Sequence, residues 1–296
     1  MMNSGALNGS DPLVRRLHEL VEQSPDLEDA ALFYEIILPL VRDADLHAAA
    51  VSLGPNEARA KLAAGLSFLQ DVELEVDLDA VHGLILRLAC ELENLGGNGR
   101  DRYRRIREAL EADRLEVGTL LSSIAAWDYG PVASAAHSLQ LDADLVLTLV
   151  KNTFKQALHA WRRQLLPFLN RIPLDRGNCP VCGAVAILGE LQDNHLAKHL
   201  RCGQCGADWT FPRLRCSYCG NDDHHTLSLL YPDPWDGKVW VEVCDKCNGY
   251  LKVIFSFTPT PADRLPIEDL ATLHLDYIAQ VHGYKRVPIG PDDVSP

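Results

Sequence analysis

The chain has 296 residues and a formal net charge of −13, with 28 Lys and Arg against 41 Asp and Glu. This length predicts about two domains, and the 47% hydrophobic content allows a sizeable core. The acidic balance disfavours a nucleic-acid-binding protein, because such a chain repels phosphate backbones. No apolar run reaches the ~20 residues that a transmembrane helix needs, so we expect no stable membrane insertion.

The amino-terminal residues bear on where the protein acts. They contain no basic start followed by an apolar stretch, and Arg15 and Arg16 lead directly into an amphipathic pattern. We therefore expect neither a Sec-type nor a twin-arginine signal, and we predict a cytoplasmic protein. Because cytoplasmic thiols stay reduced, the nine cysteines indicate metal ligands or catalytic groups before they indicate disulfides.

The first part of the chain predicts an all-α domain. Four stretches have a helical pattern, at residues 27–41, 78–95, 102–121 and 147–165. We expect Pro39 to kink or end the first stretch, Gly96 to close the second and Pro167 to stop the fourth. Several amphipathic helices with short connections predict a helical bundle or array.

The pattern changes before the first paired cysteine. Short stretches rich in β-branched and aromatic residues predict strands at residues 185–188, 239–243 and 250–255. Pro266 then begins a last helix, which Gly283 closes. The expected multidomain α and β organisation has four parts: a helical domain over 1–172, one small four-cysteine module over 173–215, a second over 216–265, and a C-terminal helix and tail over 266–296.

Eight of the nine cysteines form four Cys-x-x-Cys pairs. The pairs are Cys179 with Cys182, Cys202 with Cys205, Cys216 with Cys219, and Cys244 with Cys247. Two intervening residues let both sulfur atoms of a pair turn onto one ion. The residue after each pair is Gly three times and Asn once, and both residue types tolerate the positive φ of a tight turn. This turn chemistry predicts metal binding independently of the number of sulfur atoms.

Four pairs predict two sites, because a tetrahedral ion takes four thiolates. A gap of 19 residues follows Cys182 and a gap of 24 follows Cys219, and each can hold a short hairpin, as in zinc ribbons and rubredoxin-like modules. We therefore prefer sequential pairing, first pair with second and third with fourth, over interleaved pairing. Only ten residues separate Cys205 from Cys216, so the two modules must touch or nearly touch.

Sulfur-only sites fit zinc or iron, and the spacing does not choose between them. Four thiolates leave no open position, so hydrolysis by a metal-bound water is not expected. Iron would add one-electron redox capacity. Two simpler interpretations stay open: ions that only stabilise modules too small for a core of their own, and buried thiols or redox dithiols without metal.

Other candidate ligands have simpler structural explanations. Cys90 lies within a helical stripe, which favours a buried core thiol over a nucleophile. His195 and His199 are four residues apart and would share a metal on a helix, but a loop or hairpin edge fits better because eight cysteines already satisfy two ions. His224 and His225 are alternative ligands only if one of them replaces a cysteine.

The remaining motifs favour a binding protein over an enzyme. We expect the aromatic side chains of the cysteine region to pack its modules, namely Trp209, Phe211, Trp235 and Trp240. The chain contains no Gly-x-Ser-x-Gly, His-Glu-x-x-His or dinucleotide-binding motif. A thiol–disulfide enzyme is disfavoured because no thioredoxin-like βαβ pattern surrounds the cysteine pairs.

The order of motifs in the cysteine region resembles a known family. Its segments are Arg201-Cys-Gly-Gln-Cys-Gly-Ala-Asp-Trp209, Arg213-Leu-Arg-Cys-Ser-Tyr-Cys219 and Glu242-Val-Cys-Asp-Lys-Cys-Asn-Gly-Tyr250. The pattern is similar to that of the formate dehydrogenase accessory protein family, FdhE. The resemblance is specific from Cys179 to about Arg286, and it is looser across the helical part.

This resemblance implies a helical domain followed by two rubredoxin-like modules, with all eight paired cysteines as ligands. It implies iron as the metal, with zinc as the alternative. It also implies a non-enzymatic role in protein maturation, like that of a chaperone, in which the chain binds the catalytic subunit of a respiratory formate dehydrogenase during assembly. The competing hypothesis is a rubredoxin-like electron carrier with two iron-tetrathiolate sites.

Overall fold

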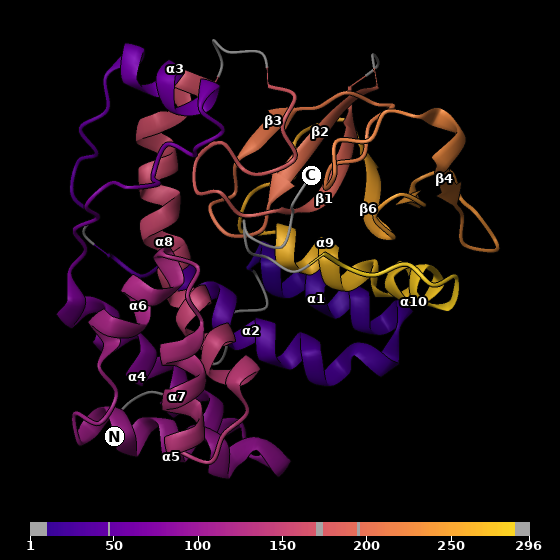
Figure 1. Ribbon diagram of the computed structural model, residues 1–296. Helices are drawn as coiled ribbons and strands as arrows, with labels where there is room; N and C mark the ends of the chain where they lie inside the picture. Colours follow the sequence, from indigo (N-terminus) through magenta and orange to yellow (C-terminus); the bar gives the residue numbers. More distant parts are fainter. Residues whose placement is uncertain (1–10, 47, 170–173, 194–195, 288–296) are drawn as a thin grey trace. The chain divides into compact units, whose positions relative to one another are not determined.

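The computed structural model describes residues 11–46, 48–169, 174–193 and 196–287 (Figure 1). The chain forms two compact units, and neither is continuous in sequence. The first comprises residues 1–49 and 75–160, and the second comprises residues 50–74 and 161–296. The first unit is helical, whereas the second holds every described strand and all eight paired cysteines.

The first unit is built on amphipathic helices. They are α1 (Pro12–Gln23), α2 (Glu28–Arg42), α4 (Leu78–Leu95), α5 (Arg100–Glu111), α6 (Val117–Ala125), α7 (Gly130–Ser138) and the first part of α8 (Ala143–Leu169), with 3-10 turns η1 (Pro25–Leu27) and η2 (Gly97–Gly99). Helix α4 contacts α2, α5 and α6, and it buries Leu88 and Leu92 completely. The expectation of a helical amino-terminal part is confirmed. None of the described helices is both long enough and apolar enough to cross a membrane.

Two details of the helical pattern differ from expectation. The prolines do not end their helices: α2 continues past Pro39 to Arg42, and α8, which Pro167 was expected to stop, continues to Leu169. The stretch 102–121 is not one helix, because α5 ends at Glu111 and α6 starts at Val117. Asp113 adopts a φ of 50°, its N–H donates to the carbonyl of Leu110, and the next N–H donates to that of Ala109. This is a helix-ending hydrogen-bond pattern in which Gly usually occupies the left-handed position. Because Asp113 occupies it here, no glycine in the sequence signals the end of α5.

A single sheet of six strands organises the second unit. The strands are β1 (Ala186–Gln192), β2 (Ala197–Cys202), β3 (Asp208–Thr210), β4 (Leu227–Leu230), β5 (Val239–Cys244) and β6 (Gly249–Ser256). Their order is β3-β2-β1-β6-β5-β4, so β1–β3 form one half and β4–β6 the other. Neighbours pair antiparallel except β1 and β6, which run parallel and join the halves. We call the β1–β6 pairing the seam.

Alternation along the strands gives the sheet two distinct faces. Val241, Val243 and Tyr250 point to one face, where they pack against Leu275 and Ala279 of the last helices. We call this the helix face and the opposite one the pocket face. The last helix expected after Pro266 is two helices, α9 (Leu265–Ala271) and α10 (Leu273–Val281). They separate at Thr272, whose hydroxyl donates to the carbonyl of Glu268 at 2.8 Å and competes with the helical hydrogen bonds.

Residues 50–74, which include helix α3 (Pro55–Ala63), also belong to the second unit. The backbone N–H of Phe68 donates to the carbonyl of Pro180 at 2.8 Å, and that of Leu69 donates to Val181 at 3.0 Å. Arg176 donates to the carbonyl of Leu66 at 2.8 Å. This segment therefore supports the backbone of the first cysteine pair.

A buried ion cluster fixes the last helices to the helix face. The ammonium group of Lys252 lies 2.6 Å from a carboxylate oxygen of Asp269 and 2.7 Å from one of Asp276. Asp276 also accepts a hydrogen bond from the Tyr250 hydroxyl at 2.7 Å, and Arg286 contacts Asp269 at 2.7 Å. Because Lys252 is almost fully buried, its charge depends on these carboxylates for compensation.

We predict that Lys252→Met strongly destabilises the second unit. The substitution leaves buried Asp276 with only the more distant cation of Arg286, at 3.6 Å, and breaking a buried pair costs about 3–5 kcal/mol. Denaturant unfolding of the metal-loaded chain measures the change. Lys238→Met is the control, because Lys238 pairs with Asp236 on the exposed surface and its loss should cost about 0–1 kcal/mol. Equal losses for the two variants would contradict this account of the cluster.

The ionisation of Asp269 makes the stability of the second unit depend on pH in the acid range. Burial raises the pKa of Asp269, but the charges of Lys252 and Arg286 outweigh burial and hold it below its ordinary value. The stabilisation is therefore complete above the unfolded-state pKa of about 3.9, and it is lost as the pH falls through the lower folded-state pKa. We expect Asp269→Asn to flatten this part of the stability profile, whereas the exposed Asp236→Asn should keep the wild-type slope.

Candidate metal centres

Each of the first three cysteine pairs occupies a tight turn with the same backbone hydrogen bonds. In the first turn, the N–H of Cys179 donates to Ala184 at 2.7 Å and the N–H of Gly183 returns to Cys179 at 2.9 Å. The turns that begin at Cys202 and Cys216 repeat both bonds at 2.8–3.1 Å. These turns point both sulfur atoms of a pair the same way.

The residue after each pair adopts the left-handed conformation that the sequence predicted. The φ angles are 84° at Gly183, 70° at Gly206, 70° at Gly220 and 55° at Asn248. Asn tolerates this region better than most residues with a side chain, which explains how the fourth turn forms without Gly.

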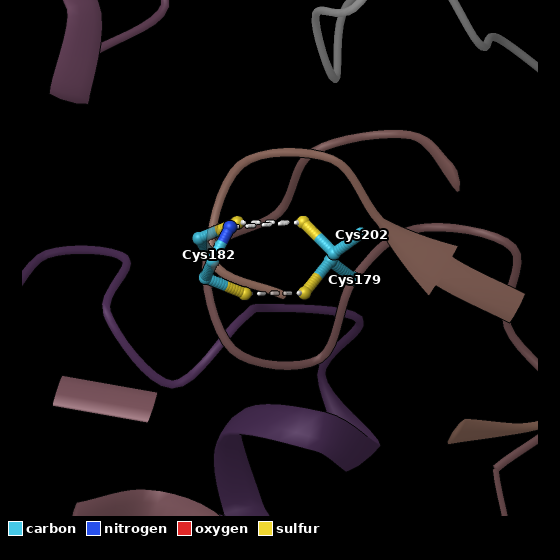
Figure 2. Close-up of side chains that lie close together, drawn as sticks. Cys179, Cys182 and Cys202 are labelled. Atoms are coloured by element: carbon cyan, nitrogen blue, oxygen red, sulfur yellow. Dashed lines mark hydrogen bonds between the residues drawn. The ribbon is translucent and has the colours of Figure 1, made fainter. Parts of the chain in front are cut away.

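The turns bring the eight sulfur atoms together in two groups of four. The first centre contains Cys179, Cys182, Cys202 and Cys205, and the second contains Cys216, Cys219, Cys244 and Cys247. In the first centre, the Sγ atoms of Cys179 and Cys205 are 3.5 Å apart, as are those of Cys182 and Cys202. Figure 2 shows the side chains of Cys179, Cys182 and Cys202 gathered at this centre. In the second, the corresponding distances are 3.7 and 3.8 Å. The grouping is sequential rather than interleaved.

These distances fit a tetrahedral thiolate site. Four sulfur atoms bound at about 2.3 Å from one ion lie about 3.8 Å from one another. A disulfide requires about 2.05 Å, so the pairs have the spacing of ligands and not of bonded sulfur atoms. The donor set is complete at both centres, and either would hold zinc or iron with no position left for water.

Polar hydrogens point at several of the sulfur atoms. The backbone N–H groups of Gln204 and Cys205 lie 3.4 Å from Cys202 Sγ. In the second centre, the N–H of Tyr218 lies 3.4 Å from Cys216 Sγ, and the Asn221 amide lies 3.5 Å from Cys244 Sγ. Such donors favour the thiolate form that a metal needs.

Arginine side chains distinguish the first centre from the second. Burial lowers the pKa of Arg162 and Arg176, while the thiolates of Cys205 and Cys179, respectively, act in the opposite direction. The Nε of Arg162 is buried and has no hydrogen-bond partner within the described part of the chain. Four thiolates around a divalent ion carry two net negative charges, which these guanidinium groups offset.

The second centre is less enclosed. Cys219 and Cys247 are half-buried, whereas only Cys182 of the first centre is. The hydrogen bond with Cys247, together with burial, raises the pKa of the Cys216 thiol well above its ordinary value. A metal ion that binds here therefore displaces a firmly held proton.

The other candidate ligands that the structure describes are not part of either centre. His199 is on β2, where it contacts Asp208 at 2.5 Å, and His195 lies outside the described residues. His224 and His225 are exposed beside Asp223, with their rings 4.0 Å apart. Cys90 is half-buried on α4, and burial raises the pKa of its thiol, as expected for an unreactive cysteine.

The aromatic residues divide into two sets. Trp209, Phe211 and Trp240 are buried against the sheet, as expected. Trp235 does not pack inside a module: it is 51% exposed, and its ring contacts that of Tyr231 at a tilt of 48°, with the centroids 4.3 Å apart. It lies in the connection between β4 and β5, which the sequence pattern did not distinguish from the strand region.

Sequence reasoning missed one residue that fixes the two turns together. A Cβ atom on Gly177 would lie 1.4 Å from the carbonyl oxygen of Ser217, so only Gly fits there. Ser217 lies within the third cysteine pair, and Gly177 precedes the first. The sequence suggested only that Gly177 belongs to a linker, because nothing in its neighbourhood indicated a distant backbone.

We predict that Gly220→Ala weakens metal binding at the second centre about tenfold, because a left-handed Ala costs about 1–2 kcal/mol. An added Cβ at Gly220 meets no atom within 4 Å, so the effect isolates backbone strain. Competition with a chromophoric chelator measures the affinity. The control is Gly83→Ala, which also meets no atom but lies within helix α4 and should leave metal affinity unchanged. Unchanged affinity in Gly220→Ala would contradict the role of this turn.

Comparisons with known proteins agree on one family. The model of the FdhE C-terminal domain matches residues 214–291, which include the second centre. A protein named as an FdhE homolog from Shewanella baltica (strain OS185) is 33% identical over 115 residues, which are 38% of this chain and 37% of that protein. One from Aquifex aeolicus (strain VF5) is 34% identical over 115 residues, 37% of this chain and 39% of that protein.

A comparison of structures covers more of the chain than these sequence matches do. The crystal structure of the FdhE protein from Pseudomonas aeruginosa matches with a TM-score of 0.58 and 24% identity, covering 93% of this chain and 91% of that one. This similarity shows a shared fold. The matches in sequence span less than two fifths of the relatives' own length. The carboxy-terminal part of the chain therefore matches the FdhE C-terminal domain, and the chain shares the fold of an FdhE protein over most of its length.

Proposed function

We propose that this protein is a cytoplasmic, non-enzymatic accessory factor for formate dehydrogenase, and that it binds the catalytic subunit of the respiratory enzyme during assembly. The observation that carries the proposal is the pair of complete four-cysteine centres on one continuous sheet, in a chain whose residues 214–291 match the FdhE C-terminal domain. The helical domain over residues 1–172 and the modules over 173–215 and 216–265 are the parts that would present the binding surface.

In this proposal both centres hold iron, with zinc as the alternative. Cys179, Cys182, Cys202 and Cys205 bind one ion, and Cys216, Cys219, Cys244 and Cys247 bind the other. The ions cross-link loops whose backbone hydrogen bonds alone fix only a few residues, and bound iron also supplies one-electron redox chemistry. The half-sheets β1–β3 and β4–β6, each with one centre, are the rubredoxin-like modules of this proposal.

A maturation role suits these sites better than catalysis. Four thiolates close the coordination sphere, so neither centre offers a position for substrate or reactive water. The centres instead hold the sheet, its loops and the adjacent 66–69 segment in one arrangement, which is what a docking surface requires.

We expect loss of the second centre to weaken binding to the catalytic subunit of formate dehydrogenase at least about tenfold, because the loops that carry the surface lose their cross-link. The test compares the metal-loaded wild type with Cys216→Ser/Cys247→Ser, using immobilised catalytic subunit and measured metal content. Cys90→Ser is the matched control, because Cys90 is the one cysteine outside both centres and should bind like wild type.

The outcomes separate the competing functions. Wild-type protein that does not bind the catalytic subunit would overturn the accessory role, and equal binding by the double variant would overturn the contribution of the second centre. Anaerobic purification followed by metal analysis and a visible spectrum tests the metal. A colourless protein with two zinc ions would exclude the rubredoxin-like electron carrier.

A further inference from the structure

A hollow of about 320 Å³ lies on the pocket face, where the connection between the two half-sheets crosses it. Its lining is mainly apolar and comes from β1, β4, β5, β6 and that connection, with Leu191, Leu214, Leu229, Trp240 and Leu251. Cys216 and Cys244 of the second centre also line it. The volume is at the lower end of the range of about 300–1,000 Å³ for binding pockets, which suits one or two side chains better than a large cofactor.

The hollow opens beside a free strand edge. Strand β4 pairs with β5, and no other described strand pairs with it. Successive side chains of β4 point to opposite faces of the sheet. Leu227 and Leu229 therefore line the hollow, while Leu230 packs against the core on the helix face. An edge strand offers backbone donors and acceptors to an added strand. An extended peptide paired with β4 would place alternate side chains over the hollow.

The apolar surface here is exposed. Leu214 is 72% exposed and Leu229 is 47% exposed, although both line the hollow. Tyr231 and Trp235 continue this exposed surface beyond the end of β4. Aromatic and large apolar residues on a surface of this kind are typical of protein interfaces.

Two arginines, Arg213 and Arg215, line the hollow in a chain whose net charge is −13. Arg213 lines the hollow and forms no ion pair with any described residue. Arg215 pairs only with exposed carboxylates, those of Asp175 at 3.2 Å and Asp222 at 4.0 Å. The one acidic side chain of the lining, Glu242, is already paired with the buried ammonium group of Lys198. A carboxylate on a ligand would therefore find the guanidinium group of Arg213, unpaired among the described residues, beside an Arg215 that is paired only at the exposed surface.

We propose that the β4 edge and this hollow bind an extended segment of a partner polypeptide that carries a large apolar side chain next to an acidic one. The segment adds to the sheet beside β4, its apolar side chain enters the hollow, and its carboxylate contacts Arg213 and Arg215. This inference rests on the proposed function, in which the partner is the catalytic subunit of formate dehydrogenase.

The contact of the hollow with the second centre provides a direct readout. Because Cys216 and Cys244 line it, a bound side chain changes the surroundings of the metal ligands. Cobalt(II) in a tetrathiolate site has a visible spectrum that is sensitive to its ligands. Segment binding should therefore shift the spectrum of the cobalt-loaded second centre and change the fluorescence of Trp240, which a contact elsewhere on the molecule would not do.

The experiment uses the full metal-loaded chain and fluorescent peptides of about a dozen residues that tile the catalytic subunit. We expect the bound peptides to carry an acidic residue beside a large apolar one, and their affinity to fall about tenfold in Leu229→Asp and in Arg213→Glu. Replacing the peptide's acidic residue with Lys should restore binding to Arg213→Glu. Peptides with N-methylated backbone amides should bind weakly, because they cannot pair with β4.

Matched controls exclude general effects of the substitutions. Leu273 has the same 47% exposure as Leu229 but lies on α10, so Leu273→Asp should bind peptides like wild type. Lys238→Glu reverses an exposed charge away from the lining and should also bind like wild type.

The remaining outcomes decide between this site and the proposed function. If the intact catalytic subunit binds wild type, Leu229→Asp and Arg213→Glu equally, the docking site is wrong while the accessory role stands. If no peptide binds and the two variants instead change the sedimentation of the protein alone, the face joins two copies of this chain and the inference is overturned. Peptide binding without binding of the intact subunit would support the site and overturn the accessory role.

Discussion

The seam between β1 and β6 is the interaction on which the second unit depends. Each half of the sheet contains one four-cysteine centre, and only the parallel pairing of Gly189 to Gln192 with Val253 to Ser256 makes them one sheet. Gly189 is suited to this position, because a Cβ there would lie 3.1 Å from a methyl group of Val253 and 3.2 Å from one of Leu251. A small module that shares a sheet with its neighbour buries more apolar surface than it would alone, so the seam reduces how much of the stability each metal must provide.

Charged side chains reinforce the seam on both faces. On the pocket face, Lys198 of β2 reaches Glu242 of β5 and so crosses β1 and β6. On the helix face, Glu190 of β1 is fully buried; it pairs with Arg201, and its carboxylate also accepts from the N–H of Thr260, which follows β6. Burying these charges is costly unless each finds its partner, so they favour one alignment of the two halves over shifted ones. The ion pairs thus contribute specificity where the apolar contacts contribute most of the stability.

The sequence predicted the local parts of this arrangement and not the connections between them. The four turns, their left-handed residues and the expected strands depend on neighbouring residues, and the positive φ of Asn248 follows from its place after Cys247. The seam could not be predicted, because this parallel pair joins strands that are more than fifty residues apart in the sequence. The residue pattern of a strand does not identify the strand with which it pairs. The roles of Gly177 and of the 66–69 segment were not predicted for the same reason, because each depends on contact with backbone that is distant in the sequence. The end of α5 was missed because Asp113 occupies a position that Gly usually signals.

The two centres differ in ways that suggest a division of roles. The first is enclosed, with Arg162 and Arg176 near its thiolates and the 66–69 segment against its backbone. Nearby cations and exclusion of water both stabilise a negatively charged tetrathiolate, so this centre should exchange its metal slowly. The second has two half-buried ligands and shares Cys216 and Cys244 with the wall of the hollow. A ligand in the hollow would lie beside these two cysteines, so a change of metal or oxidation state at the second centre would alter the wall of the hollow more than a change at the first. In the docking proposal, this placement of two ligands makes the second centre, and not the first, the one that a segment bound in the hollow would affect.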